Sequence, residues 1–286
     1  MAKAKSQPAL NVLELDTDKI LARESAVARE SDDEILDRLK ERFTILTDMT
    51  RAVKQGDVRA MIVSGPPGVG KSFGVEAVLE KDDLFNKLGE RKPKYEVVKG
   101  AMSSIGLYAK LYEFSGEKNV VVFDDCDSIL LDDLSLNILK GALDSSKKRV
   151  IAWNTDSRLL RSEGIPDRFE FKGAAIFITN IKFEHVKSKR LRDHLDALES
   201  RCHYIDLQMD TNREKLLRIR QIVEEGMLDS HEFEAVQRDE VVEFIAANQD
   251  KLRELSLRMV LKIADLRKSF PNSWTAMAKT TCMRRA

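Results

Sequence analysis

The sequence predicts an α/β protein, in which a parallel sheet carries helices on both faces and a small all-α segment follows. Two observations predict this fold class. Up to residue 208, apolar strand candidates alternate with helical or mixed segments, and that alternation favours a parallel sheet with covered faces. After residue 208 the strand candidates end, and three helical patterns follow at 211–225, 239–248 and 256–270.

The strand candidates and the first helix follow from apolar patterning. A helix is expected to begin at Ser31, a capping side chain followed by acidic residues, and to run to about residue 54. Two of the strands, 120–123 and 174–178, are continuous apolar runs, as expected for strands buried on both faces. The strands are expected at 59–64, 94–99, 119–123, 149–154, 174–179 and 203–207.

Length and composition bound the organisation. A chain of 286 residues suits one large domain and a smaller one. The 48 basic and 48 acidic residues cancel, which excludes a global field that recruits nucleic acid or membrane. Three cysteines without C-x-x-C spacing argue against a disulfide framework or a zinc site. We divide the chain into an N-terminal arm (1–30), an α/β domain (31–208), a helical domain (209–270) and a C-terminal tail (271–286).

The lengths of the apolar runs indicate whether the chain can span a membrane and whether it carries a secretory signal. None approaches the roughly 20 residues that span a bilayer, and the amino terminus lacks the apolar segment of a secretory signal. The sequence therefore predicts a cytoplasmic protein with no membrane partner.

One motif carries most of the functional information. The stretch 65–72 fits the phosphate-binding pattern G-x-x-x-x-G-K-S and lies between a buried strand and a helix. Glycines allow successive backbone N–H groups to point at phosphate oxygens. Lys71 is expected to reach the β- and γ-phosphates, and the Ser72 hydroxyl to bind Mg²⁺. The predicted nucleotide-binding residues are Gly65, Pro66, Pro67, Gly68, Val69, Gly70, Lys71, Ser72 and Phe73.

Two carboxylates follow the strand 119–123. Ligands of open α/β sheets bind at the carboxyl ends of the strands, so Asp124 is expected to help Ser72 hold Mg²⁺. Asp125 is a candidate for orienting the attacking water. The alternative interpretation is a strand followed by an acidic turn without a catalytic role.

Together with these motifs, the segment 30–270 resembles the AAA+ ATPase family. The resemblance implies a five-stranded parallel sheet followed by a helical lid, with ATP and Mg²⁺ as cofactors and assembly into a ring, expected to be a hexamer. The segment 177–180 is similar to the family's first sensor strand, which makes Asn180 a candidate contact of the γ-phosphate or the water. An asparagine that only caps the strand end is the alternative.

Two arginines complete the resemblance. Glu199-Ser200-Arg201-Cys202 resembles the finger of clamp-loader-like members, so Arg201 is expected to reach the nucleotide of a neighbouring subunit. Arg190 and Arg192 compete for that role. Arg258, at the start of the last long helix, resembles the second sensor, which closes the lid onto the γ-phosphate.

One departure from the family concerns hydrolysis. Most active members place glutamate where this chain has Asp125, which is shorter by one methylene. The resemblance therefore implies nucleotide binding and slow hydrolysis, and Asp127 is a candidate to share the role.

Two segments could contact a client. Residues 102–108 follow the second strand, where Ile105 and Tyr108 could line a central pore or belong to the apolar core. Residues 149–172 are expected to form an inserted β-hairpin, with Arg158 and Arg161 near its tip. These arginines and a basic run could bind single-stranded or duplex DNA or form a solvated face. The basic run comprises Lys182, Lys187, Lys189, Arg190 and Arg192.

The resemblance, which extends to small phage or plasmid ATPases, implies an ATPase that couples hydrolysis to remodelling or loading in DNA metabolism. A remodeller that threads polypeptide clients is the first alternative. A nucleotide-gated scaffold with very slow turnover is the second, and a small-molecule P-loop kinase is the least compatible with the paired sensors.

Overall fold

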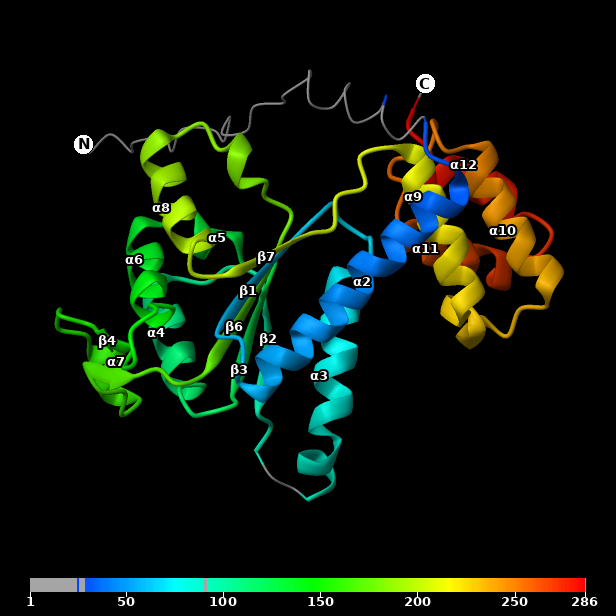
Figure 1. Cartoon of the computed structure of the whole chain (residues 1–286). Coiled ribbons are helices and arrows are strands. Elements are labelled where there is room, and N and C mark those ends of the chain that lie inside the picture. Colours follow the sequence, from blue (N-terminus) through cyan, green and yellow to red (C-terminus); the bar gives the residue numbers. More distant parts are fainter. Residues whose placement is uncertain (1–24, 26–28, 90–91, 286) are drawn as a thin grey trace, which may run out of the picture.

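A computed structural model describes residue 25 and residues 29–89 and 92–285 of the chain. The predicted N-terminal arm lies almost entirely outside the described residues. An α/β layer forms the larger part, and a cluster of helices from the C-terminal segment lies beside it (Figure 1). The domain boundaries near residues 208 and 270 stay a prediction.

The central sheet has five parallel strands in the order β2-β3-β6-β1-β7, which confirms the predicted five-stranded parallel sheet. Because every strand runs in the same direction, all carboxyl ends lie along one edge of the sheet. The strands are β1 (Ala60–Ser64), β2 (Tyr95–Lys99), β3 (Val120–Asp124), β6 (Ala174–Thr179) and β7 (His203–Asp206).

The strand side chains alternate between two apolar layers. Ile62 and Phe177 pack in the layer formed with α4, α6 and α8, whereas Met61 and Ile176 pack in the layer formed with α2 and α3. Figure 1 shows these helices covering opposite faces of the sheet. Their bounds are α2 (Asp32–Gln55), α3 (Lys71–Leu88), α4 (Ser104–Glu113), α6 (Asp133–Ala142) and α8 (Lys189–Glu199), with short α5 (Asp127–Leu130) and η1 (Phe183–His185) between them.

The predicted hairpin is present as the antiparallel pair β4 (Val150–Ala152) and β5 (Arg168–Glu170), and the short helix α7 (Arg158–Ser162) lies between its strands. Tyr108 is fully buried beneath it, where its hydroxyl donates to the Pro166 carbonyl oxygen at 2.9 Å. Its ring lies against Phe169 with centroids 5.0 Å apart. Tyr108 therefore belongs to the core, and among the two pore-loop candidates only Ile105 is partly exposed.

The C-terminal helices form their own apolar core. Their bounds are α9 (Asn212–Ile222), η2 (Val223–Met227), η3 (Asp229–His231), α10 (Ala235–Ala247), α11 (Leu257–Ser269) and α12 (Trp274–Cys282). The sequence predicts helices at similar positions for α9, α10 and α11. None of the described helices is long and apolar enough to cross a membrane.

The segment predicted as a C-terminal tail contains the helix α12, which packs into this helical core. Trp274, Ala278 and Cys282 recur every fourth residue and are buried. The Trp274 ring lies 5.1 Å from that of Phe244, and an antiparallel bridge joins Leu252 to Met283. The segment folds because its apolar stripe covers α11, although it is too short to be stable as an isolated helix.

Candidate functional site

A cavity of about 690 Å³ opens between the carboxyl edge of the sheet and the helical lid. One half is lined by the phosphate loop, the ends of β3 and β6, and the start of α11. The other half is lined by side chains of α2, α9 and η2. We refer to these as the phosphate half and the base half. The phosphate half contains Gly68, Gly70, Lys71, Ser72, Asp124, Asp125, Asn180 and Arg258, and the base half contains Phe43, Thr47, Arg218, Ile222, Glu225 and Met227.

The loop 65–70 joins β1 to α3 through backbone conformations that favour glycine. Gly68 and Gly70 have φ angles of +71° and +102°. The backbone N–H groups of residues 68–73 have no hydrogen-bond acceptor within the described part of the chain. Consecutive free N–H groups at a helix N-terminus form an anion-binding cradle. This loop can therefore hold phosphate oxygens without rearranging.

Lys71 is the buried cation of the phosphate half, with 6% of its surface exposed. Its Nζ donates to the carbonyl oxygens of Gly65 and Pro66, at 2.6 and 2.9 Å, and to Asn180 Oδ1 at 2.8 Å. All three acceptors are neutral, and burial lowers the pKa of Lys71 to about 8. An ammonium group without a bound anion in this setting is suited to exchange these acceptors for phosphate oxygens.

The structure brings the predicted metal ligands together. Ser72 Oγ donates to Asp124 Oδ1 at 2.9 Å, and Asp124 is 5% exposed. The Lys99 ammonium lies 3.5 Å from the other carboxylate oxygen. No cluster of three or more His, Cys, Asp and Glu that could hold a metal occurs within the described residues. A magnesium ion here would therefore need phosphate or water oxygens to complete its shell.

Asp125 occupies an unusual backbone conformation, with φ of +53°. Its N–H donates to the Ile178 carbonyl oxygen at 3.0 Å, and its Oδ1 accepts from Asn180 Nδ2 at 2.8 Å. Asn180 therefore links Asp125 to Lys71. Asp127, by contrast, accepts from the Thr179 hydroxyl at 2.6 Å and does not line the cavity; burial raises its pKa.

The lid touches the phosphate loop directly. Ser256 caps α11, and the N–H of Leu257 donates to the Gly68 carbonyl oxygen at 2.8 Å. A Cβ atom on Gly68 would lie 2.6 Å from the Ser256 Cβ, so only glycine fits this approach. Arg258 reaches the cavity without an ion-pair partner among the described residues, and its charge contributes to the lowered pKa of Lys71. The predicted second sensor thus lies at the site.

The base half contains residues that the sequence did not indicate. The Arg218 guanidinium carbon lies 3.6 Å from the centroid of the Phe43 ring, which joins α9 of the lid to α2. In the sequence, Phe43 is one of the apolar residues that recur at helical spacing in the predicted helix after Ser31, and Arg218 belongs to no motif. No local sequence pattern marks this pair, whereas the structure adds the kink of η2 at Gly226, which lines the same cavity.

Arg201 lies outside this cavity. It precedes β7, whose first residue pairs with the beginning of β1, so it lies at the edge of the sheet opposite to the phosphate loop. Its guanidinium donates to the Ala197 carbonyl oxygen, and its Nε is buried without an acceptor. Of the competing arginines, Arg190 pairs with Asp133 at 2.7 Å, and Arg192 donates to a backbone carbonyl.

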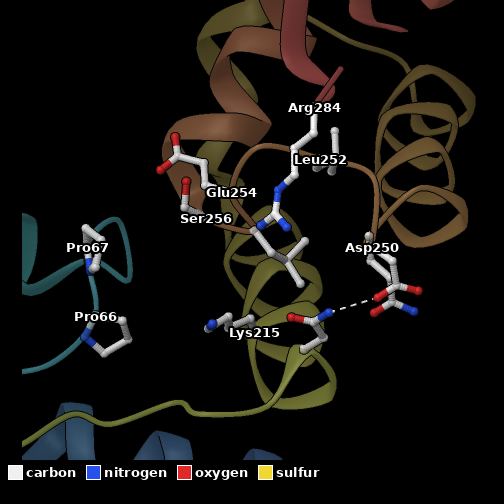
Figure 2. A pocket seen from close by; sticks show the side chains of 11 residues that line it. Pro66, Pro67, Lys215, Asp250, Leu252, Glu254, Ser256 and Arg284 are labelled. Carbon is white, nitrogen blue, oxygen red and sulfur yellow. Dashed lines mark hydrogen bonds between the residues drawn. The ribbon is translucent and has the colours of Figure 1, made fainter. Parts of the chain in front are cut away.

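A second cavity, of about 290 Å³, lies on the other side of the phosphate loop. Figure 2 shows Pro66 and Pro67 on one side and the lid residues Lys215, Glu254 and Ser256 on the other. Because proline has no N–H, this side of the loop offers no backbone donors from these two residues to an anion. The larger cavity is therefore the candidate site for a triphosphate.

Comparison with known proteins gives one relative in sequence. No known protein-family model matches the chain. An "Uncharacterized 36.7 kDa protein in nrdC-mobD intergenic region" of Enterobacteria phage T4 is 32% identical over 259 residues, which cover 87% of this chain and 76% of the relative.

Several solved structures superpose on the chain at low identity. Domain III of the Thermotoga maritima replication initiation protein DnaA has a TM-score of 0.48 at 12% identity, over 85% of this chain and 92% of that one. NtrX from Brucella abortus in complex with ATP has a TM-score of 0.49 at 12% identity, over 95% and 59%. Drosophila ORC bound to DNA has a TM-score of 0.41 at 14% identity, over 99% and 68%.

TM-scores below 0.5 mark distant superpositions, so the family rests on this chain's own features and on the phage relative. Its sequence identity places this chain in the family of the phage T4 protein, and its phosphate loop, parallel strand order and C-terminal helices are those that its resemblance to AAA+ P-loop proteins leads one to expect.

Proposed function

We propose that the chain is a Mg²⁺-dependent ATPase. The observation that carries this proposal is the pairing of a buried Lys71, whose hydrogen-bond acceptors are all neutral, with N–H groups at residues 68–73 that have no acceptor within the described part of the chain. The oxygens of one polyphosphate could accept hydrogen bonds from both the ammonium group and the loop N–H groups. The fit is chemical as well as spatial, because the Asp124 carboxylate and the Ser72 hydroxyl supply oxygen ligands for a hard cation.

Each residue then has a role. Lys71 and the loop N–H groups bind the β- and γ-phosphates, and Ser72 with Asp124 would hold Mg²⁺, which supplies charge neutralisation when bound. Asn180 orients Asp125, which accepts a proton from, or orients, the attacking water. Arg258 places its charge at the γ-phosphate when the lid closes.

A direct test measures ATP binding and phosphate release with and without Mg²⁺. We expect ATP binding that Lys71→Ala weakens strongly, and hydrolysis that requires Mg²⁺. The proposal fails if the full chain binds neither ATP nor inorganic tripolyphosphate at millimolar concentrations.

A nucleotide-gated scaffold with very slow turnover is a second candidate, and Asp125 favours it. This carboxylate is shorter than glutamate and already accepts a hydrogen bond from Asn180. If binding is tight but hydrolysis is undetectable, Asp125→Glu is expected to raise the rate. An unchanged rate would exclude the aspartate as the cause.

We further propose that the active form is a ring, expected to be a hexamer, in which Arg201 serves the site of the neighbouring subunit. Its place outside its own cavity supports this arrangement. Mixing Lys71→Ala subunits with Arg201→Ala subunits tests it. Mixed assemblies should regain hydrolysis, because one partner supplies the arginine and the other an intact phosphate loop. Mixed rings without activity would contradict the role of Arg201.

We propose DNA as the client. Arg158, Lys187 and Lys189 are exposed and without an ion pair among the described residues, whereas Lys182, Arg161 and Arg190 pair with aspartates. The unpaired cations can therefore contact phosphates at a lower cost. The burial of Tyr108 removes the aromatic candidate for polypeptide threading.

Stimulation of the ATPase by DNA should fall steeply with salt. Replacing Lys187 and Lys189 by serine should reduce it, whereas the same change at the paired Arg190 should have a smaller effect. Stimulation by unfolded protein instead of DNA would favour a protein remodeller.

A further inference from the structure

The base half of the cavity contains a buried cation to which the proposed function assigns no role. Arg218 has 7% of its surface exposed and lines the cavity. Its Nη1 donates to Gln221 Oε1 at 2.9 Å. Its Nε is buried without an acceptor, and its Nη2 has no hydrogen-bond partner among the described residues. One guanidinium nitrogen is therefore buried and unsatisfied, and a second has no acceptor within the described part of the chain.

No carboxylate of the described residues forms an ion pair with this guanidinium. The negative charge of Glu225 raises the pKa of Arg218, but the two side chains form no ion pair. Glu225 Oε1 instead accepts a hydrogen bond from Gln221 Nε2 at 2.8 Å. Burial lowers the pKa of Arg218 to about 10, so the group stays charged at neutral pH. A buried cation with unsatisfied donors is costly unless an acceptor arrives.

The surroundings define what that acceptor can be. The guanidinium carbon lies 3.6 Å from the centroid of the Phe43 ring, and Thr47, Ile222 and Met227 line the same half. This lining is largely apolar and suits a planar ring, while the guanidinium supplies hydrogen-bond donors and a second stacking face. Phosphate oxygens already have their donors at the loop. The complementary group is therefore a heteroaromatic base with ring-nitrogen acceptors.

We propose that Arg218, held over the ring of Phe43, recognises the purine base of the bound nucleoside triphosphate and determines base selectivity. A purine presents acceptor nitrogens on both of its rings, and its face is larger than that of a pyrimidine. The inference rests on nucleotide binding from the proposed function, and on neither hydrolysis nor ring assembly.

Titration calorimetry of the full chain with ATP, CTP and inorganic tripolyphosphate tests this role. Tripolyphosphate has the phosphates without a base, so it reports on the phosphate half alone. Arg218→Met should weaken ATP binding about tenfold, the factor expected for one charge-assisted hydrogen bond. The same change should leave tripolyphosphate binding within twofold and bring the ATP-to-CTP affinity ratio close to one. Arg220→Met is the matched control, because Arg220 is exposed on the same helix.

Each outcome decides between the proposals. An unchanged ATP affinity in Arg218→Met, or an equal loss for ATP and tripolyphosphate, overturns the role in base recognition while nucleotide binding stands. Absence of all binding in the unaltered protein overturns the proposed function as well. If Arg218→Met does not fold, Phe43→Leu replaces it, because loss of the stacking ring should give the same selective loss for ATP.

Discussion

The two halves of the cavity are built in different ways. Apart from Arg258 at the start of α11, the phosphate half consists of strand ends and one loop, whose positions are fixed by the hydrogen bonds of a single sheet. The base half is assembled from side chains of α2 and α9, which meet only where the lid contacts the α/β layer. The first half is therefore preorganised by the core, and the second depends on the position of the lid.

The two halves also compensate charge differently. Lys71 has three oxygen acceptors, and Asp124 and Asp125 each accept a hydrogen bond. Arg218 has one acceptor and an aromatic face. From this difference we infer that the phosphate half supplies most of the affinity for any polyphosphate, whereas the base half supplies selectivity among nucleotides.

Lys71→Ala should have the largest effect, because it removes the buried cation of the phosphate half. Charge-assisted hydrogen bonds are worth about 1.5–3 kcal/mol each, so we expect a loss of about a hundredfold or more for ATP. Calorimetry should show a similar loss for tripolyphosphate. A variant that loses ATP but keeps tripolyphosphate would reverse the assignment of the two halves.

Gly68→Ala should have the next largest effect, because Gly68 connects the halves. Its added Cβ would lie 2.6 Å from the Ser256 Cβ, at a backbone φ of +71°. We expect a loss of stability of about 1–2 kcal/mol in chemical unfolding and about tenfold weaker ATP binding. Gly100→Ala is the matched control, since Gly100 has φ of +97° and nothing within 4 Å of the added atom. Equal effects of both changes would attribute the loss to backbone strain rather than to the contact with the lid.

The same division explains which parts of the site could be predicted from the sequence. The phosphate half follows from short motifs, because the loop and each strand end place their side chains through local backbone geometry. The structure accordingly brings Ser72, Asp124 and Asn180 to one edge of the sheet. The left-handed backbone of Asp125 has no such local signal, because aspartate adopts it only where the surrounding structure requires it.

The base half and α12 depend on contacts between segments far apart in the sequence. Phe43 and Arg218 meet because of how the lid packs, and no spacing rule indicates that pair. Trp274 and Cys282 carry a short apolar stripe that follows Pro271, and this stripe gains stability only against α11. The base half and α12 therefore form through tertiary packing, which the sequence pattern does not reveal. The sheet and the phosphate loop follow from local sequence patterns and could be predicted.

The pH dependence of binding should separate the halves again. In the nucleotide-free protein the pKa of Lys71 is about 8, so the ammonium is charged below this pH and loses its proton above it. A bound triphosphate stabilises the charged form and raises the pKa, so binding takes up a proton above pH 8. ATP affinity should be constant from pH 6.5 to 7.5 and then fall by up to tenfold per pH unit. Tripolyphosphate should follow the same curve.

Lys71→Arg serves as the control for this titration, because a guanidinium stays charged throughout this range. Its residual ATP affinity should show no decline near pH 8. The ratio of ATP to tripolyphosphate affinity, corrected for the protons that each free ligand binds, should stay flat near pH 8 for the unaltered protein, since Arg218 has a pKa of about 10. A ratio that changes near pH 8 would place the titrating group in the base half.

Lys99→Met should have the smallest effect, although Lys99 lies 3.5 Å from Asp124. The Lys99 side chain is 59% exposed and also pairs with Glu76 at 2.7 Å, so solvent screens its charge. Exposed ion pairs contribute about 0–1 kcal/mol, and Asp124 keeps its hydrogen bond from Ser72. We expect ATP affinity within twofold and a free energy of unfolding within about 1 kcal/mol of the unaltered protein. A tenfold loss of affinity in calorimetry would mean that an exposed side chain, rather than the buried loop, sets the electrostatics of the phosphate half.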